Sequence, residues 1–295
     1  MYKVFAFLKR NTALLSHDEY RAGHVGFHCC NSRRLKNLRG YLVNIWANED
    51  LRAKLGDQYD AISFNEPEAF TDYWDGFPEV YFDDRESWTR AGTPEPTRAT
   101  EDGLSIDEDW TFDDVRFLFD PVESVSDEST AGEFHSHHLH MEEHLFVPVS
   151  RPEHKITKVI QFFRRAPTLS TDAFQAKMLE DYAAIASQLP GLLGYVVNFQ
   201  DENMDAAIEG YYPADSWRFS EAGRAHRAEF SNLFDGATEM HFESIEDFIK
   251  AMNSPEHQQL TQLERSLFDA LWYVEVDENL IVIPNRDPAP GFYFR

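Results

Sequence analysis

Two stretches of this chain decide the fold: Lys3–Arg10, which reads KVFAFLKR, and Lys158–Arg165, which reads KVIQFFRR. The second stretch repeats the basic and apolar pattern of the first, 155 residues later. Three further pairs of segments recur in the same order, namely 15–20 with 169–174, 40–44 with 194–198, and 75–82 with 235–242. A repeat of this length is a whole domain rather than a solenoid unit, so the sequence predicts a duplicated domain.

Length and charge limit the architecture and the partners. The chain has 295 residues, which suits two domains of about 150 residues each, and we predict them at 1–150 and 151–295. Lys and Arg number 27 against 52 Asp and Glu, which gives a formal net charge of −25. Such a chain repels phosphate backbones and anionic lipid, so we expect neither nucleic acid nor a membrane surface as a partner.

The two cysteines, Cys29 and Cys30, are adjacent in the sequence. Neighbouring residues rarely satisfy disulfide geometry, so no disulfide framework is expected and a cytoplasmic location is favoured. No apolar run reaches the roughly 18 residues of a spanning helix.

Each half contains the same order of predicted elements. A short strand (2–9, 155–164) precedes a helix that begins after Ser16 or Ser170, and a glycine then leads into a second strand. A long polar and aromatic insertion follows at 47–74 and 201–233, and loops are expected at 92–109 and 125–132. The remaining predicted elements are a third strand (79–82, 239–242), a second helix (83–88, 244–252) and a fourth strand (139–147, 272–283).

The order β-α-β-β-α-β, found twice, is typical of the ferredoxin-like split βαβ unit. Its helices cover one face of an antiparallel sheet, and the other face also needs cover. We therefore predict an α+β fold in which two ferredoxin-like repeats cover each other as an intrachain dimeric α+β barrel.

The first half resembles the EthD family of dimeric α+β barrel proteins. Tyr20, His24, His28 and 38–41, which reads LRGY, match the motif of that family in order and spacing. The segments 75–83 and 143–147 are similar to its third and last strands. The second half keeps the fold signals but has Met178 and Tyr182 where the two histidines would stand.

His24 and His28 are the chemistry-bearing pair of the first half. They lie four residues apart and share a helix face, and histidine can move a proton in either direction near neutral pH. The resemblance implies catalysis or substrate binding, with His28 as general base or acid and His24 as its orienting partner. A metal site, or two histidines without a role, are the alternatives.

Other candidate residues lie on the predicted strands. Tyr41 could donate a hydrogen bond to a substrate carbonyl or oxyanion, although its recurrence as Tyr195, like that of Asn44 as Asn198, also suits a structural role. Strand alternation places Glu79 and Tyr81 on one face, and His241 on the matching face of the second half. We expect these side chains to point into the barrel, as pocket lining or as satisfied pairs.

The segment 134–144, which reads FHSHHLHMEEH, is rich in histidine. As a strand it places His138, His140, Glu142 and His144 on one face. Residues two apart in a strand are about 6–7 Å apart, so four in a line cannot share one ion. A divalent metal, a substrate contact through His144, and a solvated polar strand all remain open.

The leading hypothesis is a cofactor-independent acid/base enzyme of lyase, dehydratase or isomerase type. It would act on a hydrophobic aromatic or polyketide-like molecule in a barrel cavity, without bound metal. The alternatives are a haem- or metal-dependent barrel enzyme and a non-catalytic small-molecule binding or accessory protein. The chain would work as a monomer or a homodimer.

Overall fold

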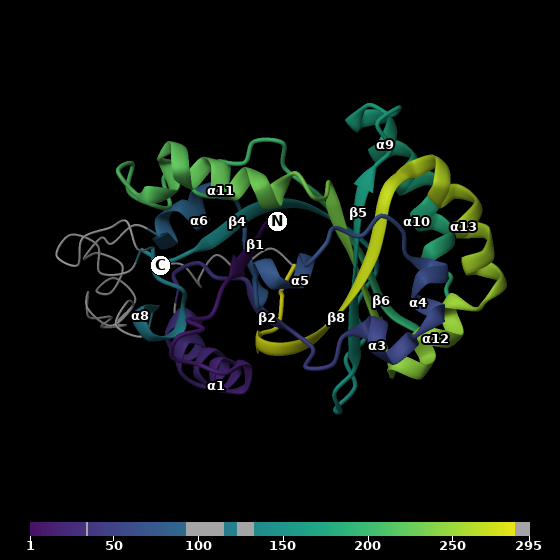
Figure 1. Ribbon diagram of the computed structural model, residues 1–295, viewed down its shortest axis with the longest axis horizontal. Coiled ribbons are helices and arrows are strands. Elements are labelled where there is room, and N and C mark those ends of the chain that lie inside the picture. The colour runs from purple at the N-terminus through teal and green to yellow at the C-terminus, as the bar shows by residue number, and fades with distance from the viewer. Residues whose placement is uncertain (34, 93–114, 123–132, 287–295) are drawn as a thin grey trace.

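The structure, a computed structural model, describes residues 1–33, 35–92, 115–122 and 133–286. Its central element is a closed antiparallel barrel (Figure 1). The strands of the barrel are β1 (Tyr2–Leu8), β2 (Gly40–Trp46), β3 (Gly76–Phe82), β4 (Ser136–Val147), β5 (Thr157–Arg165), β6 (Leu192–Gln200), β7 (Gly236–Phe242) and β8 (Phe268–Val282).

The strand order around the barrel is β1-β3-β2-β8-β5-β7-β6-β4. The first half of the chain therefore contributes β4-β1-β3-β2, and the second half contributes β8-β5-β7-β6. These two sheets meet at two seams, β2 with β8 and β4 with β6, and both pairings are antiparallel. Each seam joins a strand of one half to a strand of the other, so the barrel closes within one chain.

Short helices surround the barrel on several sides (Figure 1). The helices of the first half are α1 (His17–Gly23), the π-helical turn η1 (His24–His28), α2 (Cys29–Ser32), α3 (Leu51–Leu55), α4 (Asp57–Ile62), α5 (Phe70–Tyr73), α6 (Arg85–Gly92) and α8 (Val115–Leu118). Those of the second half are α9 (Thr171–Lys177), the π-helical turn η2 (Met178–Tyr182), α10 (Ala183–Ala186), the 3-10 helix η3 (Trp217–Phe219), α11 (Glu221–Ser231), α12 (Ile245–Met252) and α13 (Pro255–Leu267).

The predicted helix starts are confirmed. The Ser16 side chain accepts a hydrogen bond from the backbone N–H of Glu19, whose carboxylate in turn accepts from the Ser16 backbone N–H, which is a capping box. Ser170 caps α9 in the same way through the N–H of Ala173. Each helix then passes into a π-helical turn, at His24 and at Met178, 154 residues apart.

Several elements differ from the sequence predictions. The insertion at 47–74 contains α3, α4 and α5, and α13 follows the predicted helix that forms α12. The pattern missed α3, α4 and α5 because tertiary packing, rather than helix propensity, stabilises such short segments. The longer α13 does have local start signals, with Ser254 as its cap and Pro255 at its first position. The predicted loops at 92–109 and 125–132 lie outside the described residues, except that Gly92 ends α6.

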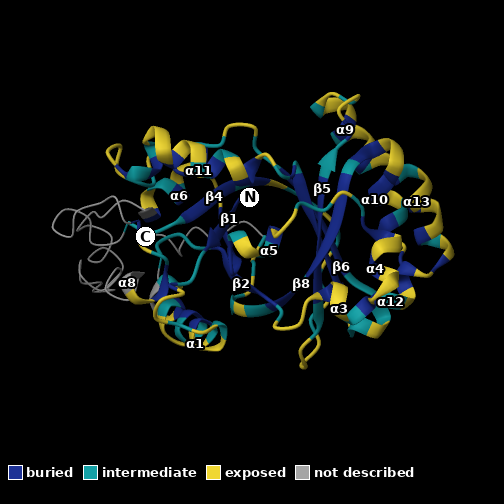
Figure 2. Ribbon diagram, in the orientation of Figure 1, coloured by how far each residue is buried: buried dark blue, intermediate teal, exposed yellow. Residues whose placement is uncertain are grey.

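Side chains alternate between the two faces of the barrel wall. In β1, Val4 packs outward against the helices, whereas Phe5 and Phe7 point inward. Figure 2 shows that the strands are the most deeply buried elements. Phe70 of α5 and Phe230 of α11 join the inward-facing aromatic side chains and fill one end of the barrel.

The two insertions pack across to the opposite half. Leu51 and Tyr59 of the first insertion belong to the hydrophobic cluster of the second half, and the Tyr59 hydroxyl donates to the carbonyl of Tyr273 in β8. Ala207 of the second insertion lies in the cluster of the first half, where its carbonyl accepts from the indole N–H of Trp88. Each half therefore completes the core of the other.

Candidate functional site

The predicted catalytic pair lies between the helices and the outer face of the sheet. His24 is buried at 1% exposure, and His28, one turn further along η1, is half-buried. The Nδ1 of His24 lies 2.9 Å from the hydroxyl of Tyr20, and the two imidazole rings meet edge to face at 5.3 Å between centroids. The structure therefore places the two histidines side by side, with His28 nearer to solvent.

Burial controls the protonation of His24. Loss of hydration holds its pKa well below 6.5, and the neighbouring His28 adds to this shift, so the His24 imidazole is neutral near pH 7. Its Nε2 is buried and has no hydrogen-bond partner among the described residues. A buried polar atom without a partner suggests a place for a polar group of a ligand or for water.

Phe119 and Tyr41 lie in the same layer as the two histidines, between the helices and the sheet. Phe119 contacts both imidazoles edge to face, at 5.5 Å from His24 and 5.2 Å from His28. The hydroxyl of Tyr41 lies 3.7 Å from the sulfur of Cys29, and burial raises the tyrosine pKa well above 10. Tyr41 thus keeps its proton and remains a hydrogen-bond donor at neutral pH.

The other predicted strand residues lie on the opposite side of the barrel wall. Glu79, Tyr81 and His241 point into the barrel, as expected from strand alternation, and Asn44 points there too, against Glu79. Tyr81 donates to Glu79 at 2.6 Å, and the Asn44 amide donates to Glu79 at 2.7 Å. Asn44 Oδ1 and His241 Nδ1 have no hydrogen-bond partner among the described residues, and the sheet separates these side chains from His24 and His28.

An ionic network, formed by two lysines, two arginines and four glutamates, fills this part of the barrel. Lys3 contacts Glu79 at 3.0 Å and Glu143 at 3.1 Å, and it also pairs with Glu239. Lys158 mirrors it, with Glu239 at 2.9 Å, Glu278 at 3.1 Å and a further ion pair to Glu79. Arginines complete the network: Arg286 pairs with Glu143 and Arg151 with Glu278.

The charges of this network balance, because four cations face four carboxylates. Burial alone would raise the pKa of Glu239, but Lys158 and Lys3 lower it to about 2. Opposite charges likewise lower the pKa of Glu143 to about 2 against the effect of burial. The carboxylates therefore stay ionised, and the interior holds a compact ionic core rather than the open cavity that the sequence hypothesis expected.

The histidines of β4 do not form one cluster. His138, His140 and His144 share the outer face, as predicted, but His138 contacts Tyr212 at 3.3 Å and His140 contacts Asp201 at 3.1 Å. His144 lies beside Glu142 at 3.3 Å, near the second half. Across the described ranges, no group of three or more His, Cys, Asp or Glu side chains is arranged to hold a metal ion.

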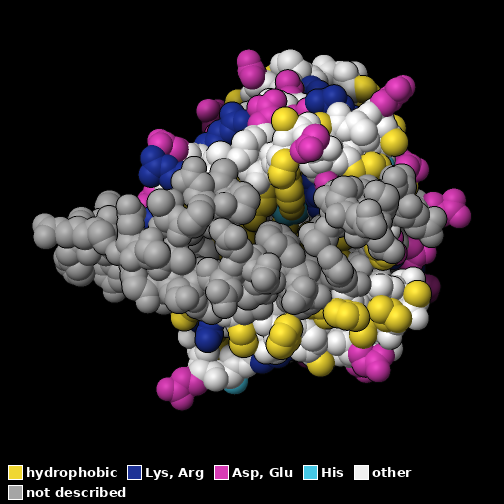
Figure 3. Space-filling view, turned by 90° about the vertical axis from the view of Figure 1, so that its left-hand side faces the viewer, with side chains coloured by type: hydrophobic (Ala, Val, Ile, Leu, Met, Phe, Trp, Pro, Cys, Tyr) yellow, Lys and Arg dark blue, Asp and Glu magenta, His cyan; other side chains and the backbone are white. Residues whose placement is uncertain are grey.

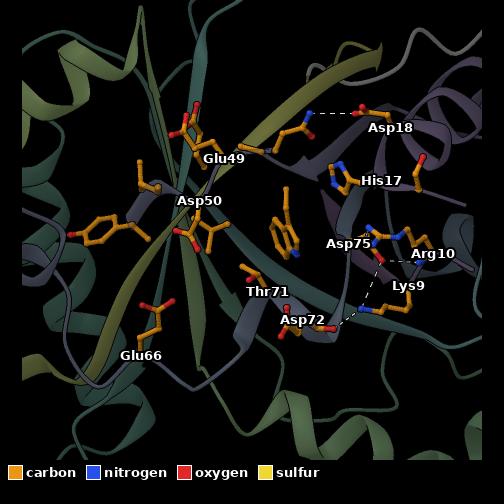
Figure 4. A pocket seen from close by; sticks show the side chains of 18 residues that line it. Lys9, Arg10, His17, Asp18, Glu49, Asp50, Glu66, Thr71, Asp72 and Asp75 are labelled. Atoms are coloured by element: carbon orange, nitrogen blue, oxygen red, sulfur yellow. Dashed lines mark hydrogen bonds and ion pairs between the residues drawn. The ribbon is translucent and has the colours of Figure 1, made fainter. Parts of the chain in front are cut away.

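A cleft of about 540 Å³ lies at the barrel rim, beside the start of α1 (Figure 4). Trp46 lies in its wall, and Asp75 forms an ion pair with Arg10 at 2.5 Å. Burial lowers the pKa of His17, and Arg21 adds to this shift. None of the predicted site residues lines this cleft, and half of its lining residues are charged.

Sequence reasoning missed Phe119 and the lysines of the ionic core. Phe119 lies 91 residues beyond His28, so no local pattern connects them. Lys3 and Lys158 were visible as the only charges at equivalent inward positions of two apolar strands, flanked by Val4 and Val159. That repeat of one charge in two buried strands was a usable signal for paired carboxylates inside the barrel.

No helix in the described part of the chain is long and apolar enough to cross a membrane. Figure 3 shows hydrophobic side chains beside the residues that the structure does not describe, and acidic side chains spread around the margin of that face. Phe27 on η1 and Phe117 on α8 have exposed rings.

The strand topology defines the class of the fold, and one domain family matches part of the chain. The chain is a closed antiparallel α+β barrel protein, and residues 166–269 match the EthD domain. This match covers α9 to α13 in the second half, whereas the sequence resemblance was drawn from the first half. No curated protein matches the chain.

Similar solved structures extend over nearly the whole chain. A proposed monooxygenase from Fusobacterium nucleatum subsp. nucleatum ATCC 25586 is 8% identical, with 97% of this chain and 94% of that chain covered and a TM-score of 0.47. An anthrone oxidase-like protein is 9% identical, with 96% and 94% covered and a TM-score of 0.48. A proposed monooxygenase from Lactobacillus acidophilus NCFM is 7% identical, with 95% and 94% covered and a TM-score of 0.46.

Proposed function

We propose that this protein is an acid/base enzyme that moves a proton on a small hydrophobic molecule, at the layer formed by His24, His28 and Tyr41. The observation that carries the proposal is the pairing of a buried, neutral His24 with a half-buried His28, beside the ring of Phe119. Two adjacent imidazoles with different burial are suited to proton transfer near neutral pH. This layer, rather than the filled barrel interior, holds the substrate.

The proposed step needs no net oxidation. His28 takes a proton from a carbon next to a carbonyl, and the electrons move onto the carbonyl oxygen. Tyr41, which keeps its proton, donates a hydrogen bond to that oxygen. His28 then returns the proton at another carbon, which gives isomerisation, or to a leaving hydroxyl, which gives dehydration.

The substrate class follows from the walls of the layer. Phe119 presents its ring edge-on to both histidines, and Tyr20 and Leu118 extend the apolar lining. We infer an aromatic or polyketide-like carbonyl compound. Five residues would then stabilise the barrel and would not contact the substrate. They are the interior Asn44, Glu79, Tyr81 and His241, and the outer His144.

We further infer that the two halves are copies of one ferredoxin-like unit, with the boundary near residue 150. The identical strand order, the two π-helical turns and the paired lysines of the ionic core support this. A barrel closed within one chain can work as a monomer, and a cytoplasmic location remains the expectation.

The test is turnover of aromatic and polyketide-like ketones, followed by hydrogen exchange from D₂O into the substrate. We expect His28→Ala to reduce exchange at least 100-fold, since general acid–base catalysis contributes about 10²–10⁴-fold. His154→Ala is the matched control, because that histidine is exposed and pairs with Glu243 outside the proposed site. Unchanged exchange in His28→Ala would refute the mechanism. Saturable binding of such a ketone without hydrogen exchange would favour a binding protein. A visible absorption band of the purified protein would favour a haem-dependent enzyme.

A further inference from the structure

The buried imidazole of His24 has a single hydrogen-bond partner in the described part of the chain. Its Nδ1 lies 2.9 Å from the hydroxyl oxygen of Tyr20, one helical turn earlier in α1, whereas its Nε2 has no partner there. Both side chains are 1% exposed, so bulk water does not reach them. A neutral imidazole carries one hydrogen, on either Nδ1 or Nε2. The position of that hydrogen decides whether Nε2 is a hydrogen-bond donor or an acceptor.

The Tyr20 hydroxyl selects between the two tautomers of His24. Burial raises the pKa of Tyr20 well above 10, so the hydroxyl keeps its hydrogen, and His24 Nδ1 is its only acceptor among the described residues. If Tyr20 donates to Nδ1, one buried group is left unpartnered, namely the Nε2–H of His24. If Nδ1 donated to Tyr20 instead, two would be left, the hydroxyl hydrogen and the lone pair of Nε2. Each unsatisfied buried polar group is costly, so the first arrangement is the more stable.

The second half has neither polar group at the equivalent positions. Phe174 in α9 and Met178 at the start of η2 stand 154 residues after Tyr20 and His24. They are 1% and 0% exposed, so this layer packs equally well without a hydroxyl or an imidazole. The two groups are absent together in one half and present together in the other. This pairing indicates that the Tyr20 hydroxyl serves His24 rather than the fold.

We propose that Tyr20 is a positioning residue whose hydroxyl holds His24 in the tautomer that carries its hydrogen on Nε2. His24 then presents a hydrogen-bond donor through Nε2, and it does not act as a base, because Tyr20 occupies its lone-pair nitrogen Nδ1. Such a donor suits an acceptor such as a ketone oxygen, whose developing negative charge it stabilises. Proton transfer is left to His28. The tautomer stands by itself, whereas its part in catalysis rests on the proposed function.

The test is NMR of protein labelled with ¹⁵N in histidine, since protonated and unprotonated ring nitrogens have well-separated chemical shifts. The His24 signals are assigned by their loss in His24→Gln. At pH 7 we expect a protonated Nε2 and an unprotonated Nδ1, with the other tautomer at about a tenth or less. Tyr20→Phe should raise the fraction of that other tautomer severalfold. Tyr182→Phe is the matched control, because it removes a buried hydroxyl from the second half and should leave the His24 signals unchanged.

A His24 protonated on Nδ1, or a tautomer ratio that Tyr20→Phe leaves unchanged, would overturn the inference. We expect Tyr20→Phe to fold, since Phe174 fills the equivalent place, and the wild-type spectrum tests the tautomer without any variant. With a ketone that the wild type turns over, Tyr20→Phe should lower kcat about tenfold and change KM less. A changed tautomer with unchanged kcat would refute the positioning role. If no ketone exchanged hydrogen, the proposed function would fail, and the spectra would still decide the tautomer.

Discussion

Replacing Lys158 by Met should strongly destabilise the protein, because it removes one of four cations from the ionic core. Lys158 is completely buried and contacts Glu79, Glu239 and Glu278, all three of which stay ionised. The substitution leaves one uncompensated negative charge where water cannot reach it. Breaking a buried ion pair by removing one partner costs about 3–5 kcal/mol, which is a large part of the 5–15 kcal/mol of a typical protein.

The assay is urea unfolding at pH 7, followed by tryptophan fluorescence. Trp272 and Trp74 pack with Phe70 and Phe230 at one end of the barrel, so their emission reports on barrel opening. Lys250→Met is the matched control, since its ammonium group is exposed and pairs with Asp247 on the surface, and we expect no measurable loss there. If Lys158→Met lowered the free energy of unfolding by less than about 1 kcal/mol, the buried ion pairs of Lys158 would not be needed for stability.

A double variant separates charge balance from packing. Lys158→Met combined with Glu79→Gln restores electrical neutrality, although it leaves fewer hydrogen bonds. We expect its free energy of unfolding to exceed that predicted by adding the two single effects, with a coupling of about 1–3 kcal/mol. Strict additivity would contradict the proposed coupling.

The remaining predictions concern pH and local structure. Because the pKa of Glu239 is lowered to about 2, its contribution to stability is present above its unfolded value near 4.5 and is lost as the pH falls toward 2; acid titration by circular dichroism checks this. Glu264 behaves oppositely, since its pKa is raised to about 7: its contribution is present below pH 4.5 and is lost as the pH rises through 7, and Glu264→Gln should flatten urea midpoints between pH 5 and pH 8. Ser16→Ala should cost about 1 kcal/mol through loss of the capping box, measured by thermal unfolding. Gly76→Ala should reduce soluble expression, because Gly76 has φ +146° and an added Cβ would collide with the carbonyl oxygen of Asn44.

Much of the barrel could be predicted from the sequence, because its information is local or repeated. The strand starting at Lys3 is an apolar run from Val4 to Leu8, its copy at Lys158 repeats this run with Gln161 as the polar exception, and Ser16 and Glu19 are a local helix signal. The helices α3 and α4 have only the capping Asp50 as a local signal, and their side chains Leu51 and Tyr59 pack in the hydrophobic cluster of the second half.

The candidate site was harder to predict. The spacing of His24 and His28 shows that they share a helix face, but not that Phe119 covers them. Inward-pointing Glu79 was predictable from strand alternation, whereas its partner Lys158 comes from the other half of the chain. Contacts between distant segments depend on how the sheets close, and periodicity does not contain that information.

The two seams of the barrel have a consequence for how the protein can vary. In a barrel made of two identical chains, every substitution occurs twice, and a large side chain near the twofold axis meets its own copy. A single chain is free of this constraint, so Phe77 and its counterpart Ala237 can be large and small within the same cluster. Trp46 and its counterpart Gln200 differ in the same way. One half can therefore acquire a new side chain while the other keeps the old one, which lets two chemistries evolve separately on one closed sheet.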